Sequence, residues 1–169
     1  VLTDAGYLEG CSAAVRHGLA IDVIVTGQQM LEVAGLADRF PDTAIIINHL
    51  GLLPLRHANQ EPSGARHVHD LVAWKEIIAQ LAPLENVYIK LGGLGMDLAS
   101  AGWQHTREPD SMELAQVMKP WYFHCIEQFG ADRCMLESNF PVDRRSFSYH
   151  VHWNAAKRLT AELSPEERE

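Results

Sequence analysis

The sequence has few basic residues, few cysteines and no long apolar run. Lysine and arginine number 14 against 22 aspartates and glutamates, for a net charge of −8. This deficit of positive charge argues against nucleic-acid binding and against a polybasic membrane surface. No apolar stretch reaches the roughly 20 residues of a membrane-spanning helix, and no secretory signal is visible in the sequence. We expect a cytoplasmic protein whose partner is a small-molecule substrate, not a nucleic acid or a membrane.

The cysteines and the chain ends bear on compartment and domain organisation. Cys11, Cys125 and Cys134 are odd in number and are not spaced as metal ligands, a pattern typical of free thiols in a reducing compartment. With 169 residues, 47% of them hydrophobic, the chain can bury one substantial core. It begins with Val1 and its last residues resemble a capped helix start. We therefore expect residues 1–169 to be a single partial domain, truncated at both ends.

Apolar runs alternate with amphipathic segments along the chain. The runs that predict strands are Ala20–Thr26, the stretch Thr43–Gly51 in which the strand ends at His49, Asn86–Leu91 and Arg133–Glu137. The segments with helical periodicity are Tyr7–His17, Gln29–Phe40, Leu71–Leu81, Ser111–Phe129 and Ser146–Leu163. Because a helix follows every strand, the sequence predicts an α/β fold with a parallel sheet and right-handed crossovers.

The lengths of the connections indicate which edge of this sheet carries the function. The helix-to-strand connections are tight, whereas two strand-to-helix connections, 52–70 and 94–110, are nearly twenty residues long. Long loops in compact domains are usually active-site loops. They leave from the carboxyl ends of the strands, where His49, Gly92 and Asn139 also lie. That edge is where chemistry is found in parallel α/β folds.

Three residues at this edge are candidate catalytic residues. His49 follows a buried strand and is either a site residue or a core histidine satisfied by the backbone. Asn139 can donate and accept hydrogen bonds but cannot act as a base. Asp143 can act as a base, or it can cap the next helix.

Four further residues are candidates for binding a substrate. Lys90 lies in an apolar strand, so it needs either a polar barrel mouth or a partner such as Glu137. Trp103 and Arg107 place an aromatic ring and a cation in one loop, which suits an anionic or cyclic substrate but also an ordinary anchored loop. Gln28 lies at the end of the first strand.

Two histidine pairs resemble metal-binding HxH motifs. His67 and His69 are in a loop that runs into a helix, and His150 and His152 are in the last predicted helix, where residues two apart do not share a face. We interpret all four as surface histidines.

Several motifs together resemble the amidohydrolase-related TIM-barrel hydrolases, most closely the lactone and pyrone-dicarboxylate hydrolase branch. They are IIINHLG (Ile45–Gly51), VYIKLGGLG (Val87–Gly95), FGADRCMLESNFPVD (Phe129–Asp143) and WNAAKR (Trp153–Arg158). The resemblance implies that the chain is the C-terminal half of a (β/α)8 barrel, comprising its last four βα units. The family's N-terminal HxH strand is absent from this sequence.

The resemblance also implies roles for two of the candidates. In this family the histidine at the position of His49 lines the metal or substrate site, and an aspartate that activates water commonly stands at the position of Asn139. An amide is a poorer ligand than a carboxylate for a divalent ion. Many members of the lactonase branch work without a metal; a divalent ion such as zinc, with His49 as one ligand, is the open alternative.

The function expected from these observations is hydrolysis of a small cyclic ester or related carboxylate-bearing compound, by attack of water on a polarised carbonyl. His49 would polarise the substrate, Asn139 would position the water, and Asp143 or a residue outside the chain would take its proton. The alternatives are a metal-dependent decarboxylase or amide hydrolase, and an inactive half-barrel with an assembly role.

An incomplete barrel also bears on assembly. Four strands do not close a barrel, so the first and last strands should be sheet edges that favour a homo-oligomer. We also expect inward side chains such as Ile45 and Ile47 to lack an opposite layer.

Overall fold

A computed structural model describes residues 2–53, 64–96, 103 and 107–168, with the backbone alone for 64–70. Four strands form one parallel sheet in the order in which they follow one another in the chain. They are β1 (Ile21–Val23), β2 (Ile45–Ile47), β3 (Val87–Leu91) and β4 (Cys134–Leu136). The predicted parallel α/β sheet is confirmed, although each strand is shorter than its apolar run.

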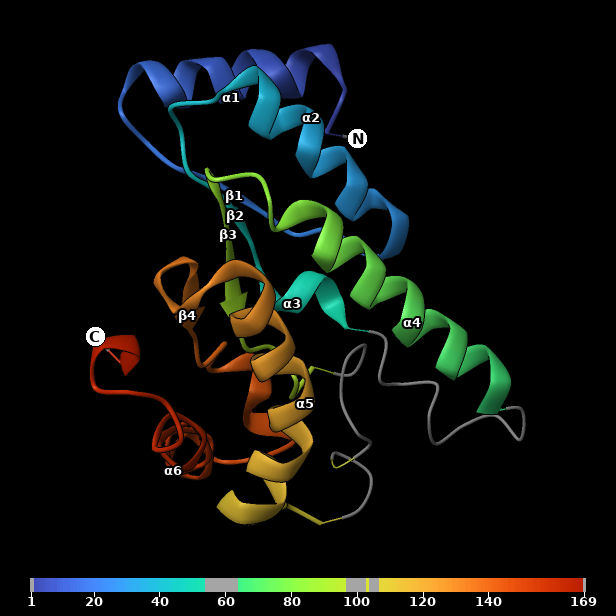
Figure 1. Ribbon diagram of the computed structural model, residues 1–169, viewed down its shortest axis with the longest axis vertical. Coiled ribbons are helices and arrows are strands. Elements are labelled where there is room, and N and C mark those ends of the chain that lie inside the picture. The colour runs from blue at the N-terminus through green and yellow to red at the C-terminus, as the bar shows by residue number, and fades with distance from the viewer. Residues whose placement is uncertain (1, 54–63, 97–102, 104–106, 169) are drawn as a thin grey trace.

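The helices lie in the connections between the strands and at the two ends of the chain. The α-helices are α1 (Ala5–Arg16), α2 (Glu32–Arg39), the short α3 (His49–Leu52), α4 (Gly64–Leu81), α5 (Ser111–Phe129) and α6 (Tyr149–Thr160). The 3-10 turns are η1 (Gly27–Leu31), η4 (Ala131–Arg133), η5 (Val142–Arg145) and η6 (Glu166–Arg168). In Figure 1 α4 and α5 lie side by side, and α6 packs against α5.

Polar side chains determine where the helices begin. Asp110 and Glu113 form a capping box at the start of α5, each accepting a hydrogen bond from the other's backbone. Ser148 caps α6, so this helix begins three residues after the expected Ser146. Residues 146–148 connect the turn η5 to this helix instead.

Helix α4 is longer than the sequence predicted. It begins at Gly64, seven residues before Leu71, so part of the expected long loop is helical. The prediction that His67 and His69 lie in a loop is therefore wrong for their backbone, and their side chains lie outside the described part of the chain. Most of the second long connection also lies outside the described residues.

The sheet has one face buried under the helices and one half-exposed face. Ile45, Ile47 and Ile89 have no exposed surface, whereas their neighbours Ile46 and Tyr88 are partly exposed. The expectation that Ile45 and Ile47 lack a covering layer is therefore wrong. A strand turns alternate side chains to opposite faces of the sheet. Three consecutive isoleucines therefore do not reveal whether the odd-numbered or the even-numbered residues face the helices.

Lys90 lies on the half-exposed face and has a carboxylate partner there. Its Nζ is 2.5 Å from Oδ2 of Asp22, which belongs to β1, two strands away. A lysine in an apolar strand does need a partner, but the suggestion of Glu137 is wrong: the partner is Asp22.

The outer strands of this sheet are β1 and β4. Assembly of the protein through these edges stays a prediction. Among the described residues, no helix is long and apolar enough to span a membrane.

Candidate functional site

The candidate site forms where side chains from two strand ends meet across a third. β3 lies between β2 and β4 and continues into Gly92 and Gly93. A Cβ on Gly92 would lie 2.3 Å from Cγ of Glu137, and one on Gly93 would lie 2.7 Å from Cβ of His49. The absence of side chains at these two positions therefore lets His49, after β2, and Glu137, after β4, reach each other.

His49 and Glu137 form a close pair, 88 positions apart in the sequence. Oε1 of Glu137 contacts Nδ1 of the His49 ring and accepts a hydrogen bond from the His49 backbone N–H at 3.1 Å. The two side chains are only 13% and 17% exposed. A partly buried carboxylate–imidazole contact of this kind is stronger than an exposed one, because less water screens it.

The backbone at both strand ends adopts a left-handed conformation. His49 has a φ of 54° and is followed by Leu50 at 57° and Gly51 at 64°, while Asn139 has a φ of 48°. Non-glycine residues rarely adopt this conformation, although asparagine tolerates it better than most. Such residues persist where surrounding contacts hold them, and they concentrate at functional sites.

Asn139 and Asp143 form a second pair beside the first. Asn139 Nδ2 donates to Asp143 Oδ1 at 2.9 Å, and the Asp143 backbone N–H donates back to the Asn139 carbonyl at 3.3 Å. Asp143 has no exposed surface. Its second oxygen accepts no hydrogen bond of good geometry from the described residues, although the amide of Gly95 lies close to the carboxyl group. The pair therefore holds the Asn139 amide in place from the buried side.

Burial raises the pKa of Asp143 to about 6. The hydrogen bonds from Asn139 and Gly95 and the nearby His49 oppose this shift, while the charge of Glu137 adds to it. The four polar residues therefore form one electrostatic unit.

Asp143→Asn is expected to remove a pH dependence of stability. Because the folded pKa is raised, the folded state keeps a proton at a pH where the unfolded chain has lost it. The stabilisation is complete below about pH 4 and is lost as the pH rises through about 6. The variant should abolish a change of roughly 1–3 kcal/mol in the free energy of unfolding. Urea unfolding at pH 4, 5, 6 and 7 measures it, with exposed Asp38→Asn as the control; parallel curves for Asp143→Asn and wild type would contradict the assignment.

Gly93→Ala is expected to destabilise the protein by about 2–4 kcal/mol and to displace the His49 ring. The new methyl group would lie 2.7–2.9 Å from Cβ, Cγ and Nδ1 of His49, at a φ of 74° that alanine tolerates poorly. The matched control is Gly35→Ala in α2, where an added Cβ meets nothing within 4 Å and should stabilise slightly. Thermal unfolding of both variants measures the difference, and equal stability would show that β3 does not constrain His49.

A buried histidine, His152, lies close to Glu137 of this four-residue cluster. His152 in α6 is 2% exposed, its ring stacks on Phe147 at 5.9 Å, and burial lowers its pKa, an effect that the nearby Glu137 carbonyl opposes. Neither ring nitrogen has a hydrogen-bond partner of good geometry among the described residues. The interpretation of His152 as a surface histidine is therefore wrong, whereas His150 is exposed. α6 turns the two to different environments, as helical spacing requires.

The remaining predicted residues lie around the cluster. Gln28 is exposed in η1, beyond the end of β1. The Trp103 ring packs edge-on against Phe147 at 5.9 Å, and the Phe147 backbone N–H donates to the Asp143 carbonyl. Arg107 is exposed at the start of α5 and forms a two-pronged ion pair with Glu113. The structure thus brings His49, Asn139 and Asp143 together. Lys90 and Arg107 instead form ion pairs with Asp22 and Glu113.

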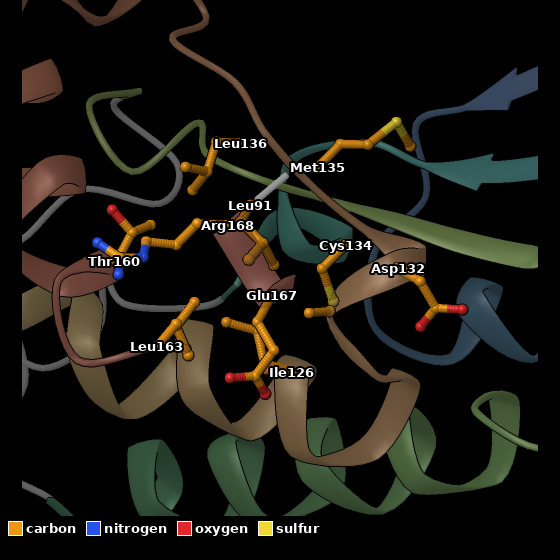
Figure 2. Close-up of a pocket in the computed structure, with 11 residues that line it drawn as sticks. Leu91, Ile126, Asp132, Cys134, Met135, Leu136, Thr160, Leu163, Glu167 and Arg168 are labelled. Atoms are coloured by element: carbon orange, nitrogen blue, oxygen red, sulfur yellow. The ribbon is translucent and has the colours of Figure 1, made fainter. Parts of the chain in front are cut away.

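A cavity of about 480 Å³ lies elsewhere, on the helix side of the edge strand β4 (Figure 2). Apolar side chains of β3, β4, α5 and the C-terminal segment line it, together with the charged residues Asp132, Glu167 and Arg168. None of the four polar cluster residues lines it, so it is separate from the candidate site.

Glu137 is the member of the cluster that sequence reasoning did not select as a site residue. In the sequence it is a candidate only as a partner for Lys90. Its signal was its position, since it directly follows β4 at the same sheet edge as His49. The GGLG motif after β3 was a second signal, because adjacent glycines mark a close approach of side chains to the backbone.

Comparison with known proteins identifies the family. The model of the amidohydrolase family matches residues 1–169. The chain belongs to the amidohydrolase family. A protein from Sinorhizobium fredii, uncharacterized protein y4mH, is 35% identical to this amidohydrolase chain over 162 residues, which are 96% of the chain and 47% of that protein. L-fucono-1,5-lactonase from Burkholderia ambifaria is 27% identical over 78% of the chain and 38% of its own length. The amidohydrolase chain thus spans about half the length of these relatives or less.

A solved structure confirms the fold class. An amidohydrolase from Burkholderia multivorans with bound HEPES superimposes with a TM-score of 0.80 at 23% identity, over 99% of this chain and 54% of that one. The same protein with bound zinc gives a TM-score of 0.79. The chain is therefore the C-terminal half of an amidohydrolase TIM barrel.

The zinc in that neighbour raises the question of whether the residues here suit a metal ion. The described part of this amidohydrolase chain contains no group of three or more His, Cys, Asp or Glu side chains that would hold one. Nδ1 of His49 is engaged by Glu137, and the side chain at position 139 is an amide. The described residues alone therefore do not form a divalent-metal site.

Proposed function

We propose that the complete protein containing this chain hydrolyses a small cyclic ester or a related carboxylate-bearing compound. Water would attack a carbonyl polarised at the strand-end cluster. Membership of the amidohydrolase family supports hydrolysis as the reaction class. The similarity to L-fucono-1,5-lactonase supports a lactone as the substrate.

The observation that carries the proposal is the meeting of His49, Glu137, Asn139 and Asp143 at the carboxyl ends of β2 and β4. Hydrolysis of an ester needs a group that takes a proton from water and hydrogen-bond donors that stabilise the developing oxyanion. The imidazole can supply the first, and the Asn139 amide, which has a second N–H besides the one donated to Asp143, can supply the other.

The buried position of Asp143 defines its part in this scheme. With no exposed surface, its carboxylate is set back from solvent, which supports a role through its neighbour over direct contact with the attacking water. It acts instead on the Asn139 amide, whose orientation it fixes through the 2.9 Å hydrogen bond.

The substrate carboxylate is assigned to Lys90 or Arg107. Each of these cations already has a carboxylate partner, Asp22 and Glu113 respectively. A substrate anion must therefore share or displace that partner. Lys90 is the better placed of the two, since it lies on the half-exposed face of β3. Trp103 and Gln28 would contact the rest of the substrate.

A second candidate function, a metal-dependent decarboxylase or amide hydrolase, is favoured by the zinc bound to the Burkholderia multivorans structure. His49 would then be one ligand, through Nε2.

An assay of the complete protein separates these functions. Purified protein is incubated with a panel of sugar lactones and carboxylated lactones, and the release of acid is followed at constant pH. Matched panels of carboxylic acids and amides test decarboxylation and amide hydrolysis. Acid release from lactones that survives chelation supports the proposal. Activity that is lost on chelation and returns with zinc assigns the metal-dependent alternative. If no compound of any panel is turned over, the result supports the third interpretation, an inactive half-barrel with an assembly role.

A further inference from the structure

Glu137 is the carboxylate that touches the candidate catalytic histidine. Its Oε1 accepts a hydrogen bond from the His49 backbone N–H at 3.1 Å. The same oxygen contacts ring Nδ1 of His49 at shorter range. Both side chains are largely buried, so water competes little for these contacts. Gly92 provides the space in which the Glu137 side chain turns toward His49.

We propose that Glu137 is a positioning residue that fixes the proton of His49 on Nδ1 and leaves a lone pair on Nε2 for the reacting water. An ionised carboxylate can only accept hydrogen bonds, so the nitrogen facing it carries the hydrogen. A neutral imidazole has one N–H, and Nε2 is therefore the acceptor. This inference rests on the proposed hydrolysis and specifies which group takes the proton.

The step that follows is balanced in atoms and charge. His49 Nε2 takes a proton from water while the water oxygen forms a bond to the lactone carbonyl carbon. The resulting imidazolium lies against the Glu137 carboxylate, which stabilises its charge. When the ring C–O bond of the tetrahedral intermediate breaks, the imidazolium returns its proton to the leaving oxygen. The product is a hydroxy acid.

The other carboxyl groups near the site do not fill this role. Asp143 has no exposed surface and binds Asn139, and Asp22 pairs with Lys90. Position 139 carries an amide, which cannot accept a proton at ordinary pH. Among the described residues, Glu137 is thus the carboxylate placed to orient His49.

Backbone geometry adds a second function to the same contact. His49 has a φ of 54°, a conformation that is unfavourable for a residue with a Cβ. The hydrogen bond from its backbone N–H to Glu137 helps to hold this conformation, so one carboxylate sets both the direction of the ring and its tautomer.

The test combines nitrogen NMR of the histidine rings with steady-state kinetics on the complete protein. Histidine labelled with ¹⁵N distinguishes a ring nitrogen that carries hydrogen from one with a lone pair, and His49→Ala identifies the His49 signals. In the wild type we expect hydrogen on Nδ1 and a lone pair on Nε2. Glu137→Ala should move the hydrogen to Nε2 and lower kcat about 10²–10⁴-fold, with KM changed less than about threefold.

Glu137→Gln keeps an oxygen that can accept from Nδ1. We expect it to retain the wild-type tautomer and to recover part of the activity lost in Glu137→Ala, and it serves as the folded comparison if the alanine variant is unstable. The control is Glu162→Ala, which removes an exposed carboxylate paired with Lys119 and should change neither readout.

The outcomes separate this inference from the proposed function. Hydrogen on Nε2 in the wild type, an Nε2 signal that changes on chelation, or a Glu137→Ala variant with unchanged kcat would each overturn the role of Glu137, even in an active lactonase. A wild type with the expected tautomer that hydrolyses no lactone would overturn the proposed function, and with it the base role of His49, while the orientation by Glu137 stands.

Discussion

Replacing His49 with alanine is expected to lower kcat/KM for lactone hydrolysis by about 10²–10⁴-fold, the usual contribution of a positioned acid–base group. The loss should be mainly in kcat, because the ring acts on the water rather than on the body of the substrate. The fold should persist, since the neighbouring Leu50 stays in the core and the backbone N–H of residue 49 can still donate to Glu137.

The matched control for this experiment is His150→Ala. His150 is exposed in α6 and contacts Asn154, so its removal should leave the kinetics unchanged. Both variants should show cooperative thermal unfolding, which confirms that they are folded. A His49→Ala protein with the wild-type rate on the same lactone would remove His49 from the mechanism.

Replacing Asn139 with aspartate is expected to cost about 2–4 kcal/mol of stability at pH 8, through loss of a hydrogen bond to a charged group and repulsion between two carboxylates. The backbone should adapt readily, because aspartate, like asparagine, tolerates the φ of 48° found at this position. The effect is therefore electrostatic: the group that now donates to Asp143 at 2.9 Å becomes a second acceptor.

The pH dependence of the aspartate variant identifies the cause. The pKa of Asp143, already about 6, should rise further, so that the two carboxyl groups share one proton at pH 5 and regain most of the lost stability. A divalent cation that bridges the two carboxylates should restore stability at pH 8 in the same way. Urea unfolding at both pH values, with and without zinc, measures these effects. Asn154→Asp, near the surface of α6, is the control, and an Asn139→Asp protein as stable as wild type under all conditions would show that the two side chains are not coupled.

The order of elements could be predicted from the sequence because it depends on local patterns. The apolar runs that end near Val23, Ile47, Leu91 and Leu136 are separated by amphipathic segments, and this alternation permits only a parallel sheet with crossovers. The boundaries were less accurate. α4 begins at Gly64 in a polar stretch that has no apolar periodicity, and α6 begins after Ser148 because a cap decides the helix start.

Part of the candidate site could also be predicted, since position after a strand is a property of the sequence. His49, Asn139 and Asp143 were selected in this way, and the structure places all three at one strand edge. The strand position of Glu137 was equally visible, but its partner was not. Whether a carboxylate pairs with Lys90 or with His49 depends on which strands are neighbours and which way each side chain points.

The sequence by itself therefore determined the parallel α/β architecture, the family and the edge of the sheet that carries the polar residues, because each depends on patterns along the chain. Only the tertiary structure decided that Ile45 and Ile47 face the helices, that Lys90 binds Asp22, and that His49 meets Glu137 across Gly92 and Gly93. Pairings over 68 or 88 positions depend on which strands are neighbours and on their register, and no local pattern encodes either.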